Sequence, residues 1–215
     1  MKNETINRIL TSLFLIPLSF FFIIKGSFYF IFFISIFFLL TIYEWHMMTS
    51  KKKYYFPGLI FVFFSYYSIY LLRTDNDANS SLIFLFVFLI CIGTDIGGYI
   101  FGKTFKGPKL TKISPNKTYS GMFGGFFLSI IIINIFINYS HLLGFNDIEF
   151  TFEGLVLVVL ISFVSQVGDL IMSYFKRLSK LKNTGKIIPG HGGILDRIDG
   201  MIFAFPFSYI IFKFF

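Results

Sequence analysis

The stretch Ser162–Gly200 reads SFVSQVGDLIMSYFKRLSKLKNTGKIIPGHGGILDRIDG, and the rest of the chain is organised around it. An apolar run carries one acid, Asp169, and ends in a Lys–Arg pair. A basic loop and the sequence Pro-Gly-His-Gly-Gly follow, and two further acids, Asp196 and Asp199, precede the next apolar run. Ionisable side chains at membrane depth are costly and usually functional. The pattern predicts a metal-assisted phosphate site at a membrane surface.

The remainder of the chain is mostly apolar. Of its 215 residues 55% are hydrophobic and 14% are charged, whereas a soluble domain carries about 25% charged residues. Backbone groups in lipid must find their partners within the segment, so the apolar runs predict helices and an all-α polytopic integral membrane protein. Seven spans are expected, at residues 9–24, 28–48, 55–72, 81–102, 121–138, 154–175 and 200–215.

The positive charges predict the orientation of these spans. With the N-terminus inside, the inner segments hold 16 of the 19 Lys and Arg residues, and the outer segments hold only Lys25, Arg73 and Lys213. Cytoplasmic loops carry an excess of Lys and Arg, so the split predicts an N-inside, C-outside protein. Topology also explains the net charge of +8 without a nucleic acid partner. A substrate bound by the basic loops is expected to come from the cytoplasm.

The fourth run ends in GTDIGGYIFGK and places Asp95 in apolar sequence. The spacing of Gly93, Gly97, Gly98 and Gly102 permits close approach to another helix. Two interpretations stay open: a packing helix with one satisfied acid, or an acid that serves the site.

The loop after the fourth run, residues 103–121, reads KTFKGPKLTKISPNKTYSG. It combines ammonium, hydroxyl and free backbone amide groups, which suit phosphate oxygens. A solvated loop on anionic headgroups would explain the same composition. The loop alone does not decide between the two.

The sixth run places an acid, a hydroxyl and two cations on one helix face. At 100° per residue, Ser173, Lys176 and Arg177 lie within about 80° of Asp169. A face of this kind is costly against lipid, so it should point into the protein.

The segment after the basic loop carries the remaining candidates. Asp196 and Asp199 are three residues apart and share one helix turn; either acid alone could also serve the helix dipole. His191, between glycines, could donate to a phosphate or assist a proton transfer. Carboxylates from two segments can share Mg²⁺, which prefers oxygen ligands and substrate phosphates. Nearby cations would neutralise a polyphosphate.

The front of the chain offers one polar group, Glu44-Trp45-His46, at the inner end of the second run. We expect Trp45 to be an interfacial anchor and His46 a polar residue at headgroup level. Glu44 is expected to pair with a lysine of another cytoplasmic loop.

At these residues the sequence resembles the phosphatidate cytidylyltransferase (CDP-diacylglycerol synthase) family over roughly residues 91–205. The family's signature has a Ser, a Lys-Arg pair, a Lys-Asp pair and a His-Gly-Gly-x-x-Asp-Arg-x-Asp ending. The matching residues here are Ser173, Lys176-Arg177, Lys182-Asn183, the run from His191 to Asp199, Gly168-Asp169-Leu170, Asp95-x-x-x-Tyr99, and Ser114-Pro115-Asn116-Lys117-Thr118 followed by Gly121.

The resemblance implies a reaction in which CTP and phosphatidic acid give CDP-diacylglycerol and pyrophosphate. It implies Mg²⁺ held by Asp169 and Asp196, with a second cation left open, and a homodimer in the bilayer of a bacterial inner membrane with the site facing the cytoplasm. We divide the chain into N-terminal transmembrane helices, 1–80, and a catalytic region, 81–215. Residues and resemblance together predict catalytic roles for Asp169, Lys176, Arg177, His191, Asp196 and Asp199, and substrate binding by Asp95, Ser114, Asn116, Lys117, Thr118, Ser173, Lys182 and Arg197.

Two residues depart from the family pattern: Asn183 stands where the family usually has Asp, and Ser120 where it usually has Glu. Other functions also stay open. A CTP-dependent kinase of lipid alcohols would need the same basic loops and acids, and an inactive relative would keep most of the motif. A cation-coupled transporter would use Asp95 and Asp169 as ion sites, but it leaves the His-Gly-Gly segment unexplained.

Overall fold

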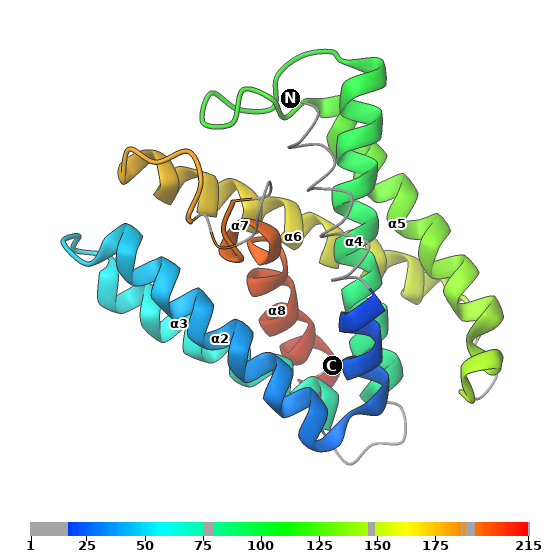
Figure 1. The fold of residues 1–215 in the computed structure, drawn as a ribbon. Coiled ribbons are helices and arrows are strands. Elements are labelled where there is room, and N and C mark those ends of the chain that lie inside the picture. Colours follow the sequence, from blue (N-terminus) through cyan, green and yellow to red (C-terminus); the bar gives the residue numbers. More distant parts are fainter. Residues whose placement is uncertain (1–16, 75–79, 146–148, 186, 188–191, 215) are drawn as a thin grey trace.

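The computed structural model describes residues 17–74, 80–145, 149–185, 187 and 192–214 (Figure 1). Regular structure in these ranges is helical, apart from isolated bridge residues at Gly192 and in the antiparallel pair Lys109 and Thr118. The chain is an all-helical polytopic membrane protein. Within the described ranges, five helices are long and apolar enough to cross a membrane: α2 (Ser27–Thr49), α3 (Tyr55–Thr74), α4 (Ser80–Phe105), α5 (Tyr119–Tyr139) and α6 (Phe152–Leu178).

The first and last predicted spans are not among these five helices. Residues 9–16 of the first run lie outside the described residues, and residues 17–25 are helical. Near the C-terminus, α8 (Met201–Phe214) is an apolar helix of 14 residues, shorter than the roughly 17 residues a span needs. The total of seven spans therefore stays a prediction, as does the boundary at residue 80. The remaining elements are the 3-10 helix η1 (Ser140–Leu143) and the short helix α7 (Leu195–Ile198).

The chain turns at Gly26, between the helical residues 17–25 and α2. Gly26 has φ of 62°, in the left-handed region that glycine adopts without strain. Arg73, at the end of α3, donates from Nε to the carbonyl oxygen of Ile23 at 2.9 Å. The guanidinium thus binds the last turn of the helix that ends at the glycine.

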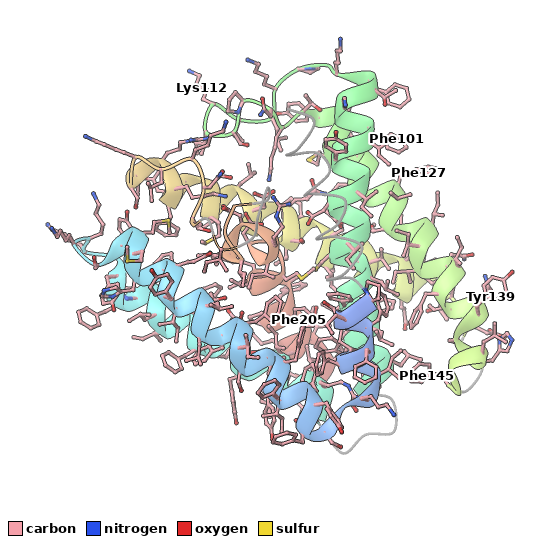
Figure 2. The ribbon with its side chains drawn as sticks, viewed as in Figure 1. Phe101, Lys112, Phe127, Tyr139, Phe145 and Phe205 are labelled. Atoms are coloured by element: carbon pink, nitrogen blue, oxygen red, sulfur yellow. The ribbon has the colours of Figure 1, made fainter. Side chains whose placement is uncertain are left out.

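Helix α8 occupies the middle of the bundle (Figure 1). It contacts α3, α4 and α6, while α2 lies beside α3 on its outer side. Phe205 of α8 is buried among the side chains of neighbouring helices, and its ring packs 4.9 Å from that of Phe84 (Figure 2). The N-terminal and C-terminal parts of the chain therefore share one core.

Helices α4 and α5 approach each other through glycines, as the spacing in α4 predicted. A Cβ atom on Gly97 would collide with the carbonyl oxygen of Gly124, and one on Gly93 would lie 2.9 Å from Cα of Ser129. The ring of Phe101 fills the space beside Gly124 and packs edge-on against Phe127, 5.8 Å away (Figure 2). The loop between the two helices therefore has closely held ends.

The basic segments gather at one end of the bundle. The α2–α3 turn, the loop between α4 and α5, and the end of α6 all lie toward the upper left of Figure 1. The start of α2 and the end of α5 lie toward the lower right. This agrees with the charge segregation in the sequence; the side of the membrane that each end faces stays a prediction.

Candidate functional site

A polar cavity of about 280 Å³ lies where α4, α5 and α6 meet the loop of residues 106–118. Every residue of this loop that was predicted to bind substrate lines it, and so do Asp95 of α4 and Asp169 of α6. Tyr99 and Gln166 add further polar groups, and Gln166 donates to the carbonyl oxygen of Met122 at 3.3 Å. The predicted residues brought together here are Asp95, Ser114, Asn116, Lys117, Thr118 and Asp169. We call this space the polar cavity.

Backbone hydrogen bonds shape the loop that covers the cavity. The amide of Leu110 donates to the carbonyl oxygen of Lys117 at 2.8 Å, and the amide of Tyr119 donates to that of Pro108 at 3.2 Å. Thr118 caps α5 by accepting from the amide of Gly121 at 3.1 Å. These bonds fold the loop back on itself and fix Lys117 next to the start of a helix.

Lys117 and Asp169 form an ion pair across the cavity. Their side chains are 27% and 28% exposed, so both remain accessible from it. Ser173, one helical turn beyond Asp169, donates to its Oδ1 at 3.4 Å. The helix face predicted from spacing is thus confirmed for the acid and the hydroxyl.

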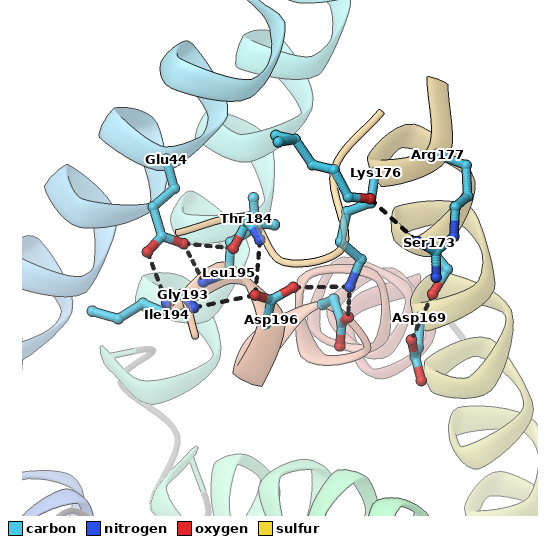
Figure 3. A network of polar contacts seen from close by, with 12 residues as sticks. Glu44, Asp169, Ser173, Lys176, Arg177, Thr184, Gly193, Ile194, Leu195 and Asp196 are labelled. Carbon is cyan, nitrogen blue, oxygen red and sulfur yellow. Dashed lines mark hydrogen bonds and ion pairs between the residues drawn. The ribbon is translucent and has the colours of Figure 1, made fainter. Parts of the chain in front are cut away.

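A second cluster of charges surrounds Lys176 (Figure 3). Its Nζ lies 2.9 Å from Oδ1 of Asp196 and 3.4 Å from Oδ2 of Asp199. Burial raises the pKa of the Asp199 carboxyl well above its usual value, the Asp169 carboxylate raises it further, and the Lys176 ammonium lowers it. One buried cation therefore holds the two acids of the HGGILDRID segment against α6.

Asp196 is also bound by the backbone of its own loop. Its Oδ2 accepts from the amides of Thr184 at 2.8 Å and Gly193 at 3.1 Å. An ionised carboxylate is the acceptor that such donors favour. Asp196 lies in the first turn of the four-residue α7, and it also pairs with Lys176 of α6.

The other predicted residues either do not line the polar cavity or lie outside the described chain. Arg177 is exposed, and its Nη1 donates to the carbonyl oxygen of Leu181 at 3.3 Å. Lys182 and Arg197 are exposed, and neither lines the polar cavity. His191 lies outside the described residues. The functional roles of these four residues stay predictions.

The side chain of Glu44, 1% exposed, is the polar group whose partners the sequence did not predict. Its described partners are not a lysine but Thr184 Oγ1 at 2.9 Å and the amides of Ile194 and Leu195 at 3.0 and 2.9 Å. An acid in an apolar helix was the available signal. The neighbouring expectation for Trp45 was wrong: its side chain is buried, and the indole N–H donates to the carbonyl oxygen of Tyr55 at 3.0 Å.

An apolar cavity of about 270 Å³ lies among α2, α3, α6, α8 and Leu195 of α7. Leu195 and Met172 line it, next in sequence to Asp196 and Ser173. The rest of its wall comes from the ends of α2 and α3, from α6 and from α8. We call this space the apolar cavity. Helices α6 and α7 contribute residues both to its lining and to the charged cluster around Lys176.

The carboxylates suit a hard cation only in part. Within the described ranges, no three His, Cys, Asp or Glu side chains converge as a ready-made metal site. Asp169 and Asp196 instead hold Lys117 and Lys176. Mg²⁺ commonly takes one or two protein carboxylates and completes its shell with water and substrate phosphates. The donor set fits that mode of binding.

Comparison with known proteins gives a consistent result. Residues 55–215 match the model of the cytidylyltransferase family. The chain is 38% identical to phosphatidate cytidylyltransferase of Brucella suis over 154 residues, which cover 71% of this chain and 54% of that protein. It is 37% identical to the protein of the same name from Rickettsia bellii over 174 residues, 78% of this chain and 73% of that one.

A third relative, phosphatidate cytidylyltransferase of Staphylococcus epidermidis, is 43% identical over 129 residues, 59% of this chain and 47% of that protein. The chain thus spans about half the length of the Brucella and Staphylococcus relatives. The matched region contains the polar cavity, the charged cluster around Lys176 and the loop between them. The chain belongs to the cytidylyltransferase family.

Proposed function

We propose that this protein transfers CMP from CTP to phosphatidic acid, giving CDP-diacylglycerol and pyrophosphate. The observation that carries the proposal is the polar cavity, where Lys117 and Asp169 meet beside the hydroxyl and amide groups of the 106–118 loop. Relatives named phosphatidate cytidylyltransferase, similar over most of this chain, support the same reaction.

The reaction needs no protein nucleophile, and the residues suit the work that remains. A phosphate oxygen of the lipid attacks the α phosphorus of CTP, the bond from that phosphorus to the bridging oxygen breaks, and pyrophosphate leaves with the electron pair. The protein's task is to orient the reactants and to offset charge. We assign Lys117 to the phosphates of CTP, and Lys176 pairs Asp196 and Asp199 with α6.

We further propose that Asp169 and Asp196 hold Mg²⁺, with room for a second cation. When bound, the ion would offset charge on the attacking and leaving oxygens. In this structure both carboxylates pair with lysines. When a carboxylate binds a cation, its lysine can bind a phosphate oxygen of the substrate instead. The uncharged Ser173 hydroxyl can keep its contact with Asp169 in either state.

The apolar cavity supports a lipid substrate. Its wall offers carbon atoms from Trp45, Phe175 and Phe203, which suit an acyl chain better than any polar ligand. The cavity adjoins Leu195, so a chain seated there would leave its headgroup near Asp196.

Further features complete the proposal. We place seven spans in a bacterial inner membrane, with the N-terminus inside and the site facing the cytoplasm, on the 16 to 3 division of cations. We also propose a homodimer, as the resemblance implies.

The test is an assay of purified full-length protein in lipid nanodiscs with phosphatidic acid, Mg²⁺ and CTP that is labelled at either the α or the γ phosphorus. With CTP labelled at the α phosphorus, the expected result is labelled lipid and unlabelled pyrophosphate. Transfer of the γ label to lipid would replace the proposal with a lipid kinase. Absence of lipid label from either position, across a range of Mg²⁺ concentrations, would remove the proposal.

A further inference from the structure

Glu44 stands apart from every other acid in the described chain because it is buried at a helix–loop contact far from its partners in sequence. It lies in α2, and the groups that donate to it, Thr184 Oγ1 and the amides of Ile194 and Leu195, are 140 to 151 residues further along the chain. Figure 3 shows its carboxylate reaching from α2 to the loop that carries these donors. The family match begins only at residue 55, so Glu44 precedes it.

The chemistry of this contact is that of an anion held by neutral donors. An ionised carboxylate only accepts, and three N–H and O–H groups are aimed at its two oxygens. Such charge-assisted bonds are stronger than neutral ones, and they offset the cost of burying the acid. The loop is packed directly on the carboxylate, because a Cβ atom on Gly193 would lie 2.7 Å from Cδ of Glu44 and one on Gly185 2.9 Å.

The contact leads directly to the charged cluster. Thr184 is bound twice: its hydroxyl donates to Glu44 and its amide donates to Oδ2 of Asp196. Leu195, whose amide Glu44 also binds, is the residue before Asp196. Asp196 in turn holds Lys176 of α6. A line of hydrogen bonds therefore runs from α2 to α6 through the loop.

We propose that Glu44 is a positioning residue, which fixes Thr184 and the start of α7 so that Asp196 faces Lys176 and the reacting phosphates. It does so without touching substrate, since its oxygens are occupied by the loop. The inference rests on the proposed function only for the role of Asp196. The ordering of the loop by Glu44 stands independently of that function.

The first experiment measures loop order directly. Amide hydrogen exchange of the full-length protein in nanodiscs is followed by mass spectrometry for Glu44→Ala, Glu44→Gln and Thr41→Val. Thr41 is the matched control: it lies one turn earlier in α2, is equally buried, and its hydroxyl bonds Tyr66 at 2.8 Å instead of the loop. Glu44→Ala should speed exchange in peptides covering residues 184–195 by about tenfold or more, the factor expected for bonds to a charged acceptor. Thr41→Val should leave those peptides unchanged.

The second experiment separates positioning from stability. Glu44→Ala should lower kcat for lipid labelling by about 10- to 100-fold, the range for residues that orient a site from outside it. KM for CTP should change less than about threefold, because the polar cavity does not include Glu44. Glu44→Gln keeps one acceptor oxygen, but its NH₂ group faces the N–H and O–H donors of the loop. Its kcat should lie between those of the unsubstituted protein and Glu44→Ala. Thr41→Val, which loses a neutral hydrogen bond to Tyr66, should lower thermal stability without lowering kcat.

The outcomes are distinct. The proposal would be overturned if loop exchange and kcat changed only in proportion to thermal stability in all three variants. Glu44 would then be a core residue. Unchanged loop exchange in Glu44→Ala would also overturn the proposal. If Glu44→Ala does not fold, the exchange and kcat of Glu44→Gln decide. Failure of the unsubstituted protein to transfer CMP would remove the proposed function, while the exchange result would still decide the role of Glu44.

Discussion

Asp169 and Asp196 are the two proposed metal ligands, and each is held by a different lysine. Replacing either acid with Asn removes a negative charge from the place where a cation is proposed to bind. Turnover by Asp169→Asn and by Asp196→Asn should fall by about 10²- to 10³-fold. Initial rates of CDP-diacylglycerol formation check this.

The control for these variants is Glu153→Gln, which removes an acid from the exposed first turn of the same α6 helix. It should retain its full rate. Thermal unfolding separates loss of chemistry from loss of fold, because Asp196 also accepts two backbone amides. Near-normal turnover by either Asn variant at low Mg²⁺ would contradict the ligand assignment.

Asn183 tests how the loop carries charge. It is exposed and lies next to Gly192, on which a Cβ atom would sit 3.4 Å from Asn183 Cβ. Its neighbour Thr184 already binds Asp196 through the backbone. We expect Asn183→Asp to change the Mg²⁺ concentration needed for half-maximal activity by less than about tenfold, as for an outer contact. A much larger gain in metal affinity would show that Asn183 occupies a vacated ligand position.

At the scale of elements, the 106–118 loop offers a matched pair of lysines. Lys117 lines the polar cavity and pairs with Asp169, whereas Lys112 lies at the outer edge of the loop (Figure 2). Lys117→Ala should raise KM for CTP and lower kcat/KM by about tenfold or more, since a charge contact to phosphate is lost. Lys112→Ala should change kcat/KM by less than about twofold. Equal effects of the two would mean that the loop acts only through its net charge.

The same elements show what sequence reasoning can reach. Apolar runs predicted α4 at residues 81–102 and α6 at 154–175, and the observed helices extend these by a few residues at each end. The composition of the 103–121 loop left two interpretations open, and the resemblance to the family singled out Ser114, Asn116, Lys117 and Thr118, which line the polar cavity. The partners of Glu44 were not, because two of them are backbone amides and any residue type can supply those. Trp45 was misplaced because an aromatic ring at a helix end suits a buried contact as well as an interface.

For the whole molecule, the distribution of cations predicts which end meets the cytoplasm. A single cysteine introduced at Lys112 should react with an impermeant maleimide only after the inner face is exposed, and one at Glu149 should react from the outer face. Both positions are exposed, Lys112 in the loop between α4 and α5 and Glu149 in the loop before α6. The native Cys91 is buried, so it should contribute little background. Labelling of position 112 only from the outer side would contradict the predicted orientation and support the opposite one.

The close contact of α4 and α5 has a consequence for binding strength. Closing a flexible loop costs conformational entropy. Because Gly97 and Gly124 bring the two helices together, residues 106–118 lose that entropy when the chain folds, before any ligand arrives. Lys117 is therefore already in position when a phosphate binds, and little binding affinity is lost to ordering the loop. A substitution that parts α4 from α5 would weaken binding in the cavity without altering any residue that lines it.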